Sequence, residues 1–224
     1  MPIIPRGYDV AAASEHLARR DRPLGTWMRR IGAIEHDFAK TFDPVDALAR
    51  AILYQQLSGK AASTIVGRVE VALASRRIQA KSLARVDDAT LRGCGVSFNK
   101  IAALRDLAAK SLEGIVPTAR QLASMPDADV IDHLTQVRGI GRWTVEMMLM
   151  ARLGRPDVLP VHDLGIRKGA QIVRKLEAMP APLHLEELGE RWRPFRTLAS
   201  FYLWRIVDAD AVKAKPVRRS QDAT

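Results

Sequence analysis

Apolar residues recur at intervals of three and four along most of the chain, which is the spacing that gathers them on one face of an α-helix. The pattern predicts helices that include residues 10–20, 23–32, 60–74, 97–112, 164–176 and 195–207. No segment sustains an alternation of apolar and polar positions at period two, so no β-strand is predicted. The sequence therefore predicts an all-α protein.

Several polar residues stand where a helix would begin. Asp43-Pro44 predicts a helix start, because an aspartate can cap the first amides and proline suits the first turn. Ser82 and Asp87 are expected to cap two short helices. In the helix predicted over 97–112, Phe98 is assigned to the inward face and Lys100 to the surface, where a charge is usually solvated or could meet a DNA backbone.

Residues 129–153 read as two helices joined by a very short turn around Gly139-Ile140-Gly141. The glycines would supply positive φ angles and close backbone approach, and Ile140 would be buried against both helices. Many helical hairpins use glycine only for steric reasons. The other interpretation is a phosphate site, because free amides at the start of the second helix favour an anion. The expected phosphate-binding set is Arg138, Gly139, Gly141, Arg142 and Thr144.

Charge favours nucleic acid as the partner. The 224 residues carry a formal net charge of +10, with 35 Lys and Arg against 25 Asp and Glu. The tail 213–224 contributes four basic residues against one acidic residue, +3 of that total, and leaves about +7 on the body. We expect a disordered basic tail over 213–224 and a body that binds a polyanion.

Composition argues against disulfides, an iron–sulfur cluster, a metal site and a secreted or membrane-spanning protein. A single cysteine, Cys94, permits no intramolecular disulfide and cannot supply the four thiolates of an iron–sulfur cluster. The histidines are scattered without a metal-ligand pattern. No apolar run is long enough for a secretory core or a membrane span. We therefore expect a soluble intracellular protein without a cofactor or required metal.

The segment Gly-Ile-Gly-Arg-Trp-Thr, residues 139–144, followed by Leu-Pro-Val-His-Asp ending at Asp163, resembles the HhH-GPD superfamily of DNA glycosylases, and within it the DNA-3-methyladenine glycosylase II branch. The resemblance spans about Pro44 to Val207. It implies a single HhH-GPD domain over 1–212 with two lobes, a central lobe of about 44–150 and N-terminal helices packed with 151–212. The chain has no room for the extra N-terminal domain of larger relatives and looks more like the compact yeast-type enzymes.

Asp163 has two interpretations. An aspartate directly before a helical stripe is ordinarily an N-cap. The resemblance makes Asp163 the catalytic residue, and the two roles are compatible because a capping carboxylate is held rigidly and kept ionised. An ionised carboxylate can stabilise the positive charge that develops on the sugar as the base departs, or can orient water toward the anomeric carbon.

The resemblance also implies a pocket for the flipped base in a cleft between the lobes, where indole faces attract cationic alkylated purines. Trp143 takes the position at which bifunctional relatives have a Schiff-base lysine, which predicts base removal without strand cleavage. Met147 stands where the bacterial relative has a pocket tyrosine. The pocket residues are Trp143, Met147, Tyr202 and Trp204.

Two further features follow from the resemblance. The segment 51–62 is similar to the one that enters the minor groove, which makes Gln56 the wedge that fills the space left by the flipped nucleotide. Residues alone would make this segment an ordinary helix junction. Family hairpins can also hold a monovalent cation, here on the carbonyls of Thr135, Val137 and Ile140.

The sequence thus predicts a monofunctional glycosylase that removes alkylated purines from duplex DNA, the first step of base excision repair. One alternative is a non-catalytic helix-hairpin-helix protein that binds damaged or bent DNA. Another is a glycosylase for deaminated purines. We expect a monomer that binds duplex DNA and no membrane, in the nucleoid if the source is bacterial and in the nucleus if it is eukaryotic.

Overall fold

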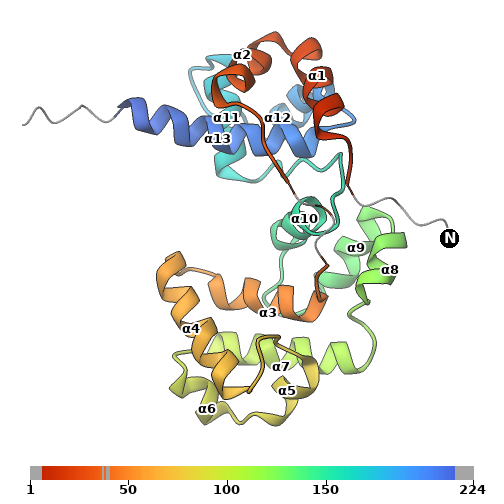
Figure 1. Cartoon of the computed structure of the whole chain (residues 1–224), viewed down its shortest axis with the longest axis vertical. Helices are drawn as coiled ribbons and strands as arrows, with labels where there is room; N and C mark the ends of the chain where they lie inside the picture. Colours follow the sequence, from red (N-terminus) through yellow and green to blue (C-terminus); the bar gives the residue numbers. More distant parts are fainter. Residues whose placement is uncertain (1–6, 37, 39–40, 215–224) are drawn as a thin grey trace, which may run out of the picture. The chain divides into compact units, whose positions relative to one another are not determined.

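The structure is a computed structural model that describes residues 7–36, 38 and 41–214. Within those residues the regular elements are all helices and no strand is found, which confirms the all-α prediction. The chain divides into two compact units (Figure 1). Of the described residues, unit 1 comprises 38 and 41–153, and unit 2 comprises 7–36 and 154–214. Most of the predicted tail, residues 215–224, lies outside the described residues.

Unit 1 is built around α7, which packs against both α3 and α5. Leu104 and Leu107 of α7 and Ile52 and Leu53 of α3 are almost fully buried, so these helices share the apolar core. The helices of unit 1 are α3 (Pro44–Tyr54), α4 (Gly59–Ala72), α5 (Ala80–Arg85), α6 (Asp88–Gly93), α7 (Phe98–Leu112), α8 (Ala119–Ser124), α9 (Asp127–Leu134) and α10 (Arg142–Ala151).

Most predicted helix starts in unit 1 are confirmed. The Asp43 carboxylate accepts a hydrogen bond from the Asp46 amide at 3.0 Å, and Asp87 caps α6. The prediction for Ser82 is wrong, because α5 begins at Ala80 and Ser82 lies inside the helix. Fully buried Ile78 and Leu83 fix this segment, so packing starts the helix before the serine.

Two expectations for α7 are also wrong. Phe98 is 71% exposed, with the Arg92 guanidinium 4.5 Å from the centre of its ring. The buried face of α7 is centred on Leu104 and Leu107, and Phe98, the first residue of the helix, lies off that face. Lys100 is not simply solvated, because its ammonium donates hydrogen bonds to backbone carbonyls of unit 1.

Unit 2 is organised by the contact of α11 with α13. A Cβ on Gly169 would lie 2.4 Å from the carbonyl oxygen of Leu203, so only glycine permits this approach of the two helices. Trp192 is fully buried in the same core. The elements of unit 2 are α1 (Val10–Arg20), α2 (Arg22–Ile31), α11 (Leu164–Arg174), α12 (Pro182–Gly189), the 3₁₀ helix η1 (Glu190–Trp192) and α13 (Arg196–Ala214).

A buried carboxylate joins three elements of unit 2. Asp21 is 2% exposed and caps α2 through the Leu24 amide at 3.1 Å. Its other oxygen accepts hydrogen bonds from the indole of Trp192 at 2.7 Å and from the guanidinium of Arg174. The charge of Asp21 is therefore balanced inside the core by a paired cation and a hydrogen-bond donor.

Candidate functional site

The turn between α9 and α10 forms the predicted hairpin. Gly139 has φ 78°, in the left-handed region, and Ile140 is 4% exposed, which confirms its predicted burial. The expectation of a positive φ at Gly141 is wrong. Gly141 has φ −96° and ψ 168°, an extended conformation open to most residues, because it is the N-cap of α10. Backbone conformation therefore requires glycine at position 139 but not at position 141.

The hairpin leaves part of its backbone available for an anion. The amides of Gly139 and Gly141 have no acceptor among the residues that the structure describes. The amide of Thr144 is not available, because it donates to the carbonyl of Gly141 at 3.0 Å. The Arg138 amide likewise donates to Asp106 at 2.7 Å. Two amides of the predicted set thus remain at the start of α10, where an anion is favoured.

The two hairpin arginines differ in their partners. Arg142 pairs with Glu146 at 2.9 Å, and the arginine side chain is 65% exposed while that of Glu146 is 9% exposed. The buried Glu146 carboxylate therefore orients the Arg142 side chain, which stays exposed to solvent. Arg138 is exposed. Both charges remain at the surface around the free amides.

Gly139→Ala is expected to lower the free energy of unfolding by roughly 1–2 kcal/mol, the cost of a left-handed L-residue. The new Cβ would also lie 3.4 Å from Ala103 Cβ. Gly141→Ala is the matched control, because nothing lies within 4 Å of its Cβ and its φ is ordinary. Urea unfolding of both variants measures the difference. Equal losses would contradict the assigned role of Gly139.

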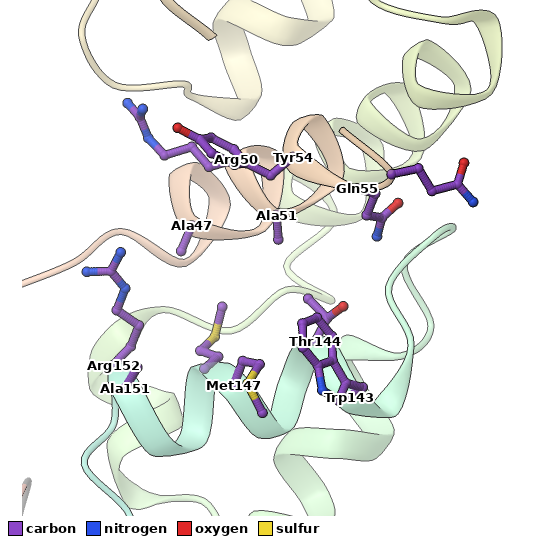
Figure 2. A pocket seen from close by; sticks show the side chains of 12 residues that line it. Ala47, Arg50, Ala51, Tyr54, Gln55, Trp143, Thr144, Met147, Ala151 and Arg152 are labelled. Atoms are coloured by element: carbon purple, nitrogen blue, oxygen red, sulfur yellow. The ribbon is translucent and has the colours of Figure 1, made fainter. Parts of the chain in front are cut away.

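Unit 1 contains a pocket of about 620 Å³ between α3 and α10, within the range of about 300–1,000 Å³ typical of small-molecule sites. Figure 2 shows the small side chains of Ala47 and Ala51 on α3 facing Met147 on α10. Their spacing of four residues puts both alanines on one face of α3, which leaves room for a ligand. The lining residues are Ala47, Arg50, Ala51, Tyr54, Gln55, Gln56, Trp143, Thr144, Met147, Met148, Ala151 and Arg152.

Four predicted site residues lie at this pocket, namely Gln56, Trp143, Thr144 and Met147. Trp143 is 51% exposed, far more than a tryptophan buried in a core would be, and Met147 is half-buried. Gln56 follows the end of α3, is exposed, and has φ 57°, which is uncommon for a residue with a side chain. The wall of the pocket therefore combines an accessible indole, a soft thioether and an amide on a strained loop.

Asp163 and Trp204 come together in unit 2. Asp163 caps α11, because its Oδ1 accepts a hydrogen bond from the Ile166 amide at 2.8 Å. The same oxygen accepts a hydrogen bond from the indole Nε1 of Trp204, also at 2.8 Å. The predicted capping is confirmed. The carboxylate and the indole thus form one hydrogen-bonded pair at the start of α11.

The structure does not bring Tyr202 to this pair. Tyr202 is 2% exposed, and its hydroxyl donates to the carbonyl of Gly32 at 3.3 Å. It lies in the core of unit 2 because α13 turns this position inward while the position of Trp204 is half-buried. The assignment of Tyr202 to a base pocket is therefore corrected, since its ring has almost no exposed surface for a base.

Sequence reasoning missed Gly165, in the first turn of α11. A Cβ at this position would lie 2.7 Å from Cδ1 of Trp204 and 3.2 Å from Oδ1 of Asp163. The absence of a side chain thus lets the indole rest on the helix start and reach the carboxylate. A glycine two residues after a helix cap was the available signal, because glycine has a poor helix propensity.

Gly165→Ala is expected to lower the turnover of the protein about ten- to a hundredfold, because the pair of Asp163 and Trp204 must shift by several tenths of an ångström or more. Gly67→Ala, in the middle of α4 with nothing within 4 Å of its Cβ, is the control and should keep the wild-type rate. Rates are compared at a temperature at which both variants are fully folded. A wild-type rate for Gly165→Ala would contradict the role of the glycine.

Comparison with known proteins places this geometry in a family. The sequence profile of the HhH-GPD superfamily base excision DNA repair proteins matches residues 49–194, more than half of the chain. The chain belongs to the HhH-GPD superfamily. Among its relatives is DNA-3-methyladenine glycosylase 1 of Schizosaccharomyces pombe, 37% identical over 177 residues, which are 79% of this chain and 77% of that protein.

Solved structures of HhH-GPD relatives have the same fold. The 3-methyladenine DNA glycosylase of S. pombe in complex with abasic DNA matches with a TM-score of 0.77 at 33% identity, over 87% of this chain and 95% of that one. A DNA-3-methyladenine glycosidase from Bacillus halodurans matches with a TM-score of 0.82, also at 33% identity, over 90% and 91%. The resemblance inferred from the hairpin motif is therefore confirmed.

Two further expectations concern metal ions and membranes. In the described part of the chain, no group of three or more His, Cys, Asp or Glu side chains is arranged to hold a metal ion. Nor does any described helix have the length and apolar character needed to cross a membrane. The cation on the carbonyls of Thr135, Val137 and Ile140 stays a prediction. The carbonyl of Val137 accepts a hydrogen bond from the Ile140 amide at 3.0 Å.

Proposed function

We propose that the protein is a monofunctional DNA glycosylase that hydrolyses the N-glycosidic bond of alkylated purines, 3-methyladenine and 7-methylguanine, in duplex DNA. The observation that carries the proposal is the carboxylate of Asp163, fixed by a helix amide and by the indole of Trp204. Membership of the HhH-GPD superfamily and relatives named as 3-methyladenine glycosylases support the choice of substrate.

In the proposed reaction Asp163 acts as an anion held in place before the substrate arrives. Positive charge develops on the deoxyribose as the bond to the base breaks, and a fixed carboxylate in a poorly hydrated site stabilises that charge. Water then adds to the anomeric carbon. The helix amide and the indole restrict the carboxylate to one orientation, so little reorganisation accompanies the reaction.

The bases proposed as substrates suit the aromatic residues of the chain. Alkylation at N3 of adenine or N7 of guanine makes the nucleotide cationic, and a cation is attracted to an indole face. Trp143 offers such a face in unit 1 and Trp204 in unit 2. Alkylation also weakens the glycosidic bond, so less activation of the leaving group is needed. A chain with these residues can therefore act without an evident general acid.

Strand cleavage is not part of the proposal. The residue after Gly-Ile-Gly-Arg is Trp143, which has no amine to form a Schiff base with the abasic sugar. The proposed protein therefore leaves an intact abasic strand. Efficient borohydride trapping of the protein on DNA would contradict this.

DNA binding is assigned mainly to phosphate contacts and to one inserted side chain. The amides of Gly139 and Gly141 and the surrounding arginines would hold a phosphate, and Gln56 would enter the minor groove. A protein with this substrate works where the genome lies, in the nucleoid of a bacterium or the nucleus of a eukaryote. We propose that it acts as a monomer.

The test is the release of free base from methylated duplex DNA, separated by chromatography. The expected result is the release of 3-methyladenine and 7-methylguanine above the uncatalysed rate. Release only from DNA that contains deaminated purines would favour a glycosylase for those lesions. Binding to damaged DNA without release of any base would leave the non-catalytic hairpin protein as the function.

A further inference from the structure

The loop between α3 and α4 is tied to the hairpin by one side chain. The Nε2 atom of Gln55 donates a hydrogen bond to the carbonyl oxygen of Gly139 at 2.8 Å. Gln55 is the C-cap that follows the last residue of α3, Tyr54, and Gln56 comes next in the left-handed region. Figure 2 shows Gln55 on the side of α3 that faces α10. The side-chain amide of Gln55 thus connects the proposed wedge loop with the proposed phosphate site.

Lys100 on α7 also holds this loop in place. Lys100 Nζ donates to the carbonyl oxygen of Leu53 at 2.7 Å and to that of Gln55 at 2.8 Å. The last turn of α3 contains no basic residue, so this cation comes from another helix to stabilise the C-terminal carbonyls. Burial lowers the pKa of Lys100 below its ordinary value. The two carbonyls replace the water that the ammonium loses.

The hairpin is fixed to α7 as well. Asp106 Oδ2 accepts hydrogen bonds from the Arg138 amide and from Lys110 Nζ, both at 2.7 Å. Lys110 also donates to the carbonyl of Gln136 at 2.6 Å. Residues 100, 103, 106 and 110 follow one another at intervals of three and four, which puts them along one side of α7. That side of α7 therefore holds both the loop and the hairpin.

From this arrangement we propose that Gln55 is a positioning residue for base flipping. Its amide keeps the loop of Gln56 in register with the hairpin, so that the wedge enters the groove while the hairpin holds the phosphate. The inference rests on the proposed function and on Gln56 as the wedge. A non-glycine residue in the left-handed region is not stable by itself and needs bonds from its surroundings. Gln55 and Lys100 supply such bonds just before Gln56, one to the hairpin and two from α7.

The test compares an alkylated purine in a duplex with the same lesion in a single strand, which needs no unpairing. Gln55→Met keeps the length of the side chain and removes the donor. Its excision rate in the duplex should fall about tenfold, equal to about 1.4 kcal/mol and within reach of one hydrogen bond. The single-strand rate and the melting temperature should stay close to those of the wild type. Gln55→Glu, which puts a carboxylate against the Gly139 carbonyl, should reduce the duplex rate further.

Gln136→Met is the matched control, because the amide of this glutamine bonds locally, to the Asp132 carbonyl of the preceding helix α9 at 3.2 Å. It should leave the rate on both substrates unchanged. An equal fall on duplex and single strand for Gln55→Met, or no fall on either, would overturn the positioning role.

A second readout separates this inference from the reaction itself. Fluorescence of 2-aminopurine placed next to the lesion reports flipping without chemistry, and it should rise on binding of the wild type but not of Gln55→Met. If the wild type flips the nucleotide, Gln55→Met does not, and neither protein releases base, the proposed function fails while the role of Gln55 stands. If both proteins flip equally, the role of Gln55 is refuted whatever base is released.

Discussion

Asp163→Asn is expected to lower the rate of base release about 10²- to 10⁴-fold, the usual contribution of a positioned acid–base or charge-stabilising group. Asparagine is as good an N-cap as aspartate, and its side-chain oxygen can still accept from the Ile166 amide and from the indole of Trp204. The substitution therefore removes the negative charge and keeps the geometry. A loss of this size reports the charge itself.

The measurement is single-turnover release of 3-methyladenine at matched occupancy of the DNA by the wild type and the variant. Affinity for an abasic duplex should stay within a few-fold, because Asp163 is assigned to the reacting sugar and not to phosphate. Asp163→Ala, which also loses the cap and the partner of Trp204, should be less stable than Asp163→Asn. An Asp163→Asn variant with nearly wild-type turnover would exclude the carboxylate as the catalytic group.

The largest effect on stability is expected from Asp21→Ala, a loss of roughly 3–5 kcal/mol in the free energy of unfolding. The side chain of Asp21 is fully buried and that of Arg174 is 14% exposed. Burial lowers the pKa of Arg174, and the charge of Asp21 acts to raise it, so the aspartate offsets part of the cost of burying the guanidinium. Removing it leaves a buried cation without its partner and the Trp192 indole without an acceptor.

Urea unfolding followed by far-UV circular dichroism measures the loss. Asp9→Ala is the control, because Asp9 caps α1 in the same unit through the amides of Ala11 and Ala12 but is exposed, and it should cost only about 1 kcal/mol. Adding Arg174→Met to Asp21→Ala should recover stability, since the unpaired charge is then gone. Equal losses for Asp21→Ala and Asp9→Ala would contradict the role of burial.

Local sequence determined most of the helices and several of their starts. Asp43, Ser97 and Asp163 each cap a helix through their own side chains, because the first amides of a helix need an acceptor within three residues. The buried Ile140 and the left-handed Gly139 were predicted for the same reason, since a two-helix turn of this length leaves few conformations. Motif and spacing were also sufficient to identify the family.

Tertiary contacts decided the rest. Helical spacing misplaced Phe98 and missed the partners of Lys100, and the resemblance misplaced Tyr202, because neither shows which neighbours a side chain meets. Sequence separation hid the bond of Gln55 to Gly139 in the same way. These contacts depend on which helices pack together.

The pairing of Asp163 with Trp204 shows most clearly what the sequence determined and what only tertiary packing decided. The sequence determined that Asp163 caps a helix, and by resemblance it singled out both residues. Only the packing of α11 on α13, made possible where Gly165 and Gly169 have no side chain, brought the indole to the carboxylate at 2.8 Å. A cap is set by residues next to one another along the chain, whereas a catalytic pair needs atoms from distant segments to meet.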